Sequence, residues 1–160
     1  MSSEQRRKPN RIPDFDYSQN YAYFLTICTE NKQCIFGTVS NDAETKAAHI
    51  RLSKEGIIAD QAIRAIPEHY PAVKLEKYVV MPNHIHILLR LENAEGTSPI
   101  SVSTVVQQLK GYVSKQIGRP IWQKLYYDHV VRDMDDFAVK WRYIENNPYR
   151  WAEDKYYTGD

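Results

Sequence analysis

Long apolar runs are missing from this sequence. No stretch approaches the roughly 20 consecutive apolar residues that a helix needs to cross a bilayer, and the start, Met1 to Gln5, is polar and unlike a signal peptide. Cysteine is scarce, and Cys28 and Cys34 lack the spacing of a metal site. Unpaired thiols persist in a reducing compartment. We therefore expect a cytoplasmic protein with no membrane partner.

A glycine-rich loop and a strong charge of one sign are also absent. The six glycines are scattered, so the sequence offers no loop of the kind that cradles nucleotide phosphates. The formal net charge is only +1, so any surface that attracts nucleic acid must be local.

One local basic surface is predicted between Gly96 and Tyr127, a stretch that contains no Asp or Glu. Lys110, Lys115, Arg119 and Lys124 lie in it, among aromatic side chains that can stack on bases. These four cations are candidate contacts to a nucleic-acid backbone. An ordinary solvated helix face is the alternative.

The length of 160 residues predicts a single domain spanning residues 1–160. Residues 1–20 are expected to form a basic N-terminal arm, in which Arg6, Arg7 and Lys8 are further candidate contacts to a nucleic acid; a solvated tail is the alternative. Residues 149–160 form a C-terminal tail rich in aromatic residues, which we expect to pack back on the body.

Hydrophobic periodicity predicts strands and helices in alternation. The pattern favours an α+β fold, an antiparallel sheet with helices packed on one face, of the split β-α-β kind that is called ferredoxin-like or RRM-like. Strands are expected at about 21–29, 33–39, 48–52, 73–91 and 122–131, and helices at about 56–66, 101–117 and 135–146.

The stretch from Tyr78 to Leu91 carries the first chemical signal. Side chains two residues apart in a strand share one face, so His84 and His86 point the same way and form half of a site for a divalent metal. Two incidental histidines on a strand are the alternative. In the last predicted helix, Tyr143 and Asn147 are four residues apart and share a face. The amide oxygen of Asn147 suits a hard ion such as Mg²⁺ or Mn²⁺.

These residues resemble a known family. Pro82-Asn83-His84-Ile85-His86 matches the HUH signature (His, bulky apolar residue, His) of the single-strand tyrosine transposases of insertion sequences. Blocks such as Tyr23 to Cys28, Tyr126 to His129 and Tyr143 to Pro148 are similar to the REP-associated branch of that family. The resemblance covers roughly residues 15–151.

The resemblance implies a metal-dependent transposase and endonuclease. Such an enzyme cleaves and rejoins single-stranded DNA near hairpins formed by palindromic repeats, through a 5′-phosphotyrosine intermediate. It implies Tyr143 as the nucleophile and His84, His86 and Asn147 as ligands of Mg²⁺ or Mn²⁺. Many members have Gln at the position of Asn147, and the shorter Asn requires helix and sheet to lie closer together. The family includes both monomers and homodimers, and the sequence leaves both open.

Three other hypotheses remain open at this point. Tyr112 is a rival nucleophile, although Gln116, four residues later, fits the family pattern less well. A second hypothesis is a domesticated, non-catalytic module that still binds hairpin DNA but no longer cleaves it. A metal-dependent nuclease using water would form no covalent adduct and would tolerate Tyr143→Phe.

Overall fold

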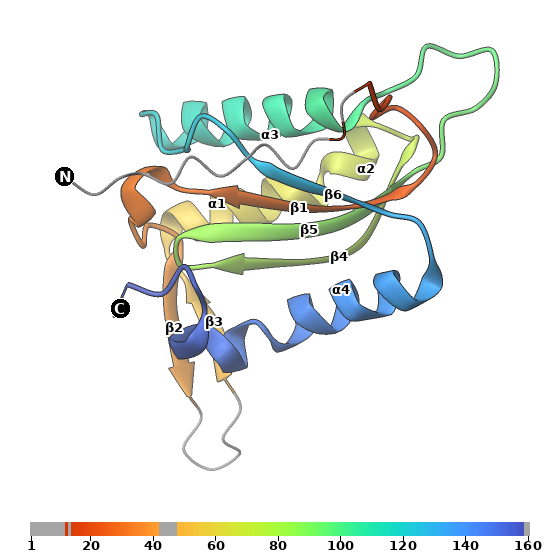
Figure 1. The fold of residues 1–160 in the computed structure, drawn as a ribbon. Helices are drawn as coiled ribbons and strands as arrows, with labels where there is room; N and C mark the ends of the chain where they lie inside the picture. Colours follow the sequence, from red (N-terminus) through yellow and green to blue (C-terminus); the bar gives the residue numbers. More distant parts are fainter. Residues whose placement is uncertain (1–11, 13, 42–47, 159–160) are drawn as a thin grey trace.

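A computed structural model describes residue 12, residues 14–41 and residues 48–158. Arg6, Arg7 and Lys8 of the predicted basic arm lie outside these residues. The body is a four-stranded sheet in the order β4-β5-β1-β6, in which each neighbouring pair is antiparallel (Figure 1). Its strands are β1 (Ala22–Cys28), β4 (Val73–Met81), β5 (His84–Leu91) and β6 (Tyr127–Val131).

The connections make two split β-α-β units, which confirms the ferredoxin-like prediction. Helix α1 (Lys54–Arg64) lies between β1 and β4, and α3 (Val102–Ile117) lies between β5 and β6. In each unit the two strands are separated by one antiparallel strand of the other unit, so they run parallel to each other. The short α2 (Ile66–His69) follows α1.

One face of the sheet packs against α1 and α3 (Figure 1). Tyr23, Leu25 and Ile27 of β1 point to this face, because they alternate along the strand, and all are fully buried. Ser53 and Ser101 cap the two helices by accepting hydrogen bonds from backbone N–H groups. Within α1, the apolar Ile57 is exposed, while Gly56 is buried.

The last helix, α4 (Met134–Asn146), covers the opposite face of the sheet, which corrects the expectation that the helices pack on one face (Figure 1). Phe137, Trp141 and Ile144 pack there against residues that include Phe24 and Leu88. Every residue of β1 is buried. A strand with apolar side chains on both faces needs cover on both, so the sheet is the middle of three layers.

A second, two-stranded sheet projects from the body as a hairpin of β2 (Gly37–Asn41) and β3 (Ala48–Leu52) (Figure 1). The 3₁₀ turns η1 (Glu30–Lys32) and η2 (Pro148–Glu153) follow β1 and α4. As expected, the C-terminal tail packs back on the body, through Trp151 of η2 and through Tyr156 beyond it. No helix within the described residues is long and apolar enough to span a membrane.

Candidate active site

His84 and His86 lie side by side on the face of the sheet that α4 covers. A two-residue turn, Pro82-Asn83, joins β4 to β5, and His84 is the first residue of β5. Both side chains are buried, with 0% and 1% of their surface exposed, and their ring centroids are 4.7 Å apart. The alternation expected from the sequence therefore brings the two imidazoles together.

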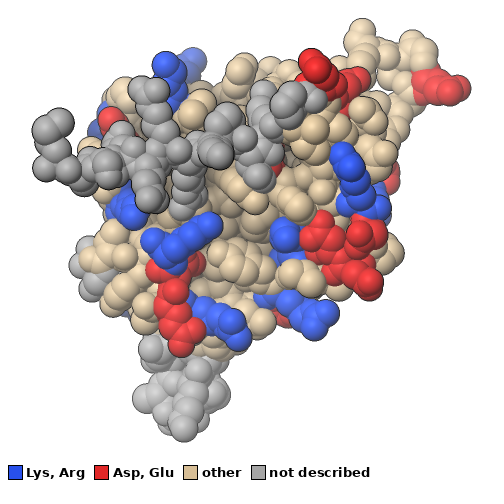
Figure 2. Space-filling view, viewed as in Figure 1, with Lys and Arg blue, Asp and Glu red and all other residues tan. Residues whose placement is uncertain are grey.

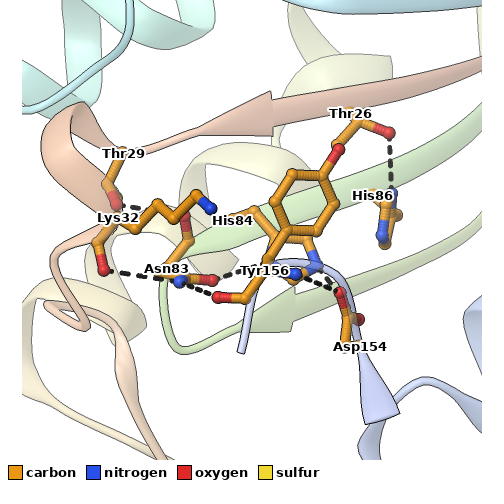
Figure 3. Close-up of polar contacts among 8 residues, drawn as sticks. All are labelled: Thr26, Thr29, Lys32, Asn83, His84, His86, Asp154 and Tyr156. Carbon is orange, nitrogen blue, oxygen red and sulfur yellow. Dashed lines mark hydrogen bonds and ion pairs between the residues drawn. The ribbon is translucent and has the colours of Figure 1, made fainter. Parts of the chain in front are cut away.

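Hydrogen bonds at Nδ1 orient both rings (Figure 3). His84 Nδ1 lies 2.8 Å from Asn83 Oδ1, and the amide of Asn83 donates in turn to the carbonyl oxygen of Tyr156 at 2.6 Å. With its nitrogen so engaged, Asn83 presents oxygen to His84, so Nδ1 of His84 carries the proton. His86 Nδ1 lies 2.9 Å from Thr26 Oγ1 on the neighbouring strand. The Nε2 atoms are left to face the interior of the site.

Three buried atoms in this region make no hydrogen bond within the described part of the chain: Nε2 of His84, Nε2 of His86 and Oδ1 of Asn147. Buried polar atoms without partners are rare, and each calls for a physical explanation. All three atoms are lone-pair donors of the kind that ligate divalent metals. Two neutral imidazole nitrogens and one amide oxygen form a donor set that fits a divalent cation.

Burial keeps both imidazoles neutral. Loss of solvent lowers the pKa of His84 from 6.5 to about 3; the neighbouring Asn147 amide opposes this shift and the charge of Lys155 adds to it. Burial also lowers the pKa of His86 well below its ordinary value, and the proximity of His84 acts in the same direction. Neutral imidazoles keep their lone pairs available at physiological pH.

Tyr143 and Asn147 approach the histidines from α4. The Tyr143 ring lies 5.2 Å from the His86 ring and 5.9 Å from the Phe24 ring, centroid to centroid, and is 40% exposed. Asn147 follows as the C-terminal cap of the helix, still in helical conformation, and is 3% exposed. The i, i+4 spacing thus places an accessible phenol above a buried amide.

The phenol borders a cavity of about 220 Å³ between α4 and the edge strand β6. His86 contributes to its floor, and Tyr127, Lys140 and Lys155 to its walls. In the register of the sheet, Tyr127 pairs with Thr26 and Thr26 with His86, so these side chains form one row on the same face. Tyr143 is therefore accessible from this cavity.

Two residues of the tail at the site were not predicted. Asp154 Oδ2 lies 3.8 Å from His84 Nε2, and burial raises the pKa of this carboxyl, although hydrogen bonds from Tyr156 and Asn147 oppose the shift. The Tyr156 ring centroid is 4.4 Å from that of His84 (Figure 3). Neither residue belongs to a periodic element, so sequence patterns carried no signal for them. Among the described residues, no three His, Cys, Asp or Glu side chains form a metal cluster.

The predicted DNA contacts on α3 lie away from this site. Lys110 donates to the carbonyl oxygens of Gln123 and Lys124 at 2.8 and 3.3 Å, and burial lowers its pKa. This lysine therefore ties the 118–126 segment to α3. The other three predicted DNA contacts of this stretch are exposed, either on α3 or in the segment that follows it: Lys115, Arg119 and Lys124. Figure 2 shows basic and acidic side chains interspersed on the face in view.

The rival nucleophile Tyr112 is 54% exposed on α3. That helix packs on the face of the sheet opposite to His84 and His86. The sheet therefore separates Tyr112 from His84 and His86, while Tyr143 lies beside His86.

Comparison with solved structures identifies the fold. The chain matches the structure of a REP-associated tyrosine transposase bound to a REP hairpin with a TM-score of 0.65 and 19% sequence identity, over 88% of this chain and 73% of that chain. The fold is that of a tyrosine transposase.

Two proteins of Haemophilus influenzae (strain ATCC 51907 / DSM 11121 / KW20 / Rd) are similar in sequence. An uncharacterized protein is 27% identical over 174 aligned residues, 95% of this chain and 93% of that one. A protein named "putative REP-associated tyrosine transposase" is 27% identical over 92 residues, which is 51% of this chain and 52% of that one. No protein-family model matches. The resemblance to REP-associated tyrosine transposases is thus confirmed.

Proposed function

We propose that this protein is a metal-dependent transposase that cleaves and rejoins single-stranded DNA beside a hairpin. One observation carries the proposal: three buried ligand atoms without hydrogen bonds, on His84, His86 and Asn147, lie beside the accessible phenol of Tyr143. A solved structure with this fold is described as bound to a REP hairpin, which supports hairpin DNA as the substrate.

In the proposed reaction, the Tyr143 hydroxyl oxygen attacks the phosphorus of the scissile linkage. A bond forms between this oxygen and phosphorus, and the bond from phosphorus to the 3′-oxygen breaks. The phenol gives up its proton and the leaving 3′-oxygen acquires one, so the products are a 5′-phosphotyrosine and a free 3′-hydroxyl. Attack by a 3′-hydroxyl reverses these steps and joins strands, because the covalent link keeps the energy of the broken bond.

The residues around Tyr143 have separate tasks. His84, His86 and Asn147 would hold the cation, which supplies charge to draw electrons from the phosphate oxygens when bound. Thr26 and Asn83 fix the two imidazole rings through Nδ1. Phe24 and His86 support the tyrosine ring by edge contacts. A free phenol is almost fully protonated at neutral pH, so this positioning matters for its reactivity.

The test uses end-labelled single-stranded oligonucleotides containing hairpins, incubated with Mn²⁺ or Mg²⁺ and separated on a denaturing gel. We expect a covalent protein-DNA adduct with the wild-type chain and none with Tyr143→Phe. Tyr112→Phe is the matched control, because it removes the same atom from the opposite face, and it should retain the adduct.

Other outcomes would identify other functions. Cleavage without an adduct, surviving in Tyr143→Phe, would indicate a nuclease that uses water. Tight hairpin binding with no cleavage in either metal would indicate a non-catalytic binding module. Loss of the adduct in Tyr112→Phe alone would overturn the assignment of Tyr143.

A further inference from the structure

Lys140 lies on the same face of α4 as Tyr143, three residues earlier, and lines the same cavity. Its ammonium group is 5.8 Å from the centroid of the Phe24 ring. The same ring stacks on His86 at 5.1 Å and meets the edge of Tyr143 at 5.9 Å. One aromatic ring therefore contacts a cation, the proposed nucleophile and a proposed metal ligand.

A network from two elements holds this lysine. Asp136 accepts from Lys140 Nζ at 3.1 Å through Oδ1, and its Oδ2 lies 2.7 Å from Nε2 of His129 on β6. Burial raises the pKa of Asp136, but the hydrogen bonds and charges of His129 and Lys140 outweigh it and leave the pKa lowered. An isolated lysine on a helix loses much side-chain entropy when it is ordered. Here the carboxylate is itself fixed by a strand, so Lys140 is preorganised.

The charges around the cavity suit an anion. Among the described residues that line it there is no Asp or Glu, and the charged groups are Lys140 and Lys155. Lys155 belongs to the tail and lies over the ring of Tyr156, 5.2 Å from its centroid. Of these two lysines, Lys140 lies on the same helix, α4, as the proposed nucleophile Tyr143.

We propose that Lys140 binds a backbone phosphate of the DNA strand presented to Tyr143, and that Asp136 and His129 position it for this contact. The proposal rests on the function proposed above and adds a substrate-contacting residue to it. Lys140 lies one turn from the phenol and lines a cavity whose described lining residues include no Asp or Glu, so its charge would offset that of a phosphate next to the attacking oxygen.

The test measures binding without cleavage, in the Tyr143→Phe background. The probe is a labelled hairpin oligonucleotide with single-stranded flanks, and its Kd is measured in Mn²⁺ over a series of salt concentrations. The slope of log K against log salt is negative, and each phosphate contact on a single strand adds about 0.7 to its magnitude. We expect Lys140→Gln to reduce this magnitude by about 0.7, and Lys140→Arg to restore it.

Arg142→Gln is the matched control, because it removes one positive charge from the exposed side of the same helix, outside the cavity. We expect its slope to equal that of the parent. An unchanged slope in Lys140→Gln would overturn the proposal, as would an equal decrease in Arg142→Gln, which would indicate a general field effect.

A second measurement locates the contact. Phosphates in the flanks of the probe are replaced one at a time by neutral methylphosphonates. At one position the replacement should weaken binding by the parent and leave Lys140→Gln unaffected, since two changes that remove the same contact are not additive. Full additivity at every position, or no binding of the probe by the parent, would contradict a role for Lys140.

The two proposals fail separately. If the wild-type chain forms no covalent adduct while the slope and methylphosphonate results hold, the strand-transfer function is wrong and the phosphate contact stands. If the adduct forms at Tyr143 and the slope does not respond to Lys140→Gln, the function stands and the role of Lys140 is wrong.

Discussion

At the scale of single residues, the site depends on two ring nitrogens that make no hydrogen bond within the described residues. The Nε2 atoms of His84 and His86 face the interior because Asn83 and Thr26 engage the opposite ring nitrogens. Partners of this kind fix the orientation and tautomer of ligating histidines. The spacing His-x-His predicted the shared face, but the sequence did not reveal which side chains orient the rings.

Thr26→Val tests this orientation. Valine has nearly the same shape as threonine and removes only the hydroxyl that lies 2.9 Å from His86 Nδ1. Loss of such an outer partner typically weakens metal binding by about 10- to 100-fold. We expect that loss for Mn²⁺, measured by electron paramagnetic resonance of the free ion in a titration. An affinity equal to that of the wild type would show that Thr26 does not support a metal site.

The buried neutral histidines also predict acid sensitivity of the metal-free protein. In the folded chain the pKa of His84 is about 3, against 6.5 ordinarily, so between these values the unfolded state binds a proton that the folded state does not. Stability is therefore complete above pH 6.5 and falls as the pH decreases toward 3, by about 1.4 kcal/mol per pH unit for one such group.

Urea unfolding in the presence of a chelator, compared between wild type and His84→Gln, isolates this contribution. The stability of the wild type relative to the variant should decrease as the pH is lowered from about 6.5. A difference that stays constant with pH would mean that His84 is not buried in its neutral form.

At the scale of secondary-structure elements, the helix glycines Gly56 and Gly111 differ in the space around them. A Cβ atom on Gly56 would collide with the backbone carbonyl of Phe36, whereas Gly111 in α3 has open space around it. Gly56→Ala should destabilise the protein by about 2 kcal/mol through overpacking. Gly111→Ala should stabilise it by roughly 0.5–1 kcal/mol, because alanine favours the helix. Opposite shifts of the urea midpoint test this, and shifts of the same sign would contradict the packing of α1 on Phe36.

Sequence periodicity predicted the elements better than their placement. The main strands and helices, and their split β-α-β order along the chain, follow from local patterns. The position of α4 does not, because an apolar stripe such as Phe137, Trp141 and Ile144 shows that a helix face is buried without showing which side of the sheet buries it. The hydrophobic run of β1 contained that information, since both of its faces are apolar.

At the scale of the whole molecule, one layer of helices builds the main core and the other contributes to the candidate site. One face of the sheet forms the main core with α1 and α3. The other face presents His84 and His86 to α4, which supplies Tyr143, Asn147 and Lys140. The candidate site could be predicted in part because His-x-His and the i, i+4 pair are local patterns. Asp154 and Tyr156 could not, because the path of an irregular tail depends on the finished fold.

The most direct test of the central claim is to locate the covalent bond. An oligonucleotide adduct formed in Mn²⁺ would be digested with nuclease and trypsin, and the peptide running from Tyr143 to Arg150 sequenced by fragmentation mass spectrometry, which separates Tyr143 from Tyr149. We predict a nucleotide attached through its 5′-phosphate to Tyr143. A nucleotide on Tyr149, Tyr112 or any other residue would contradict the assignment of the nucleophile.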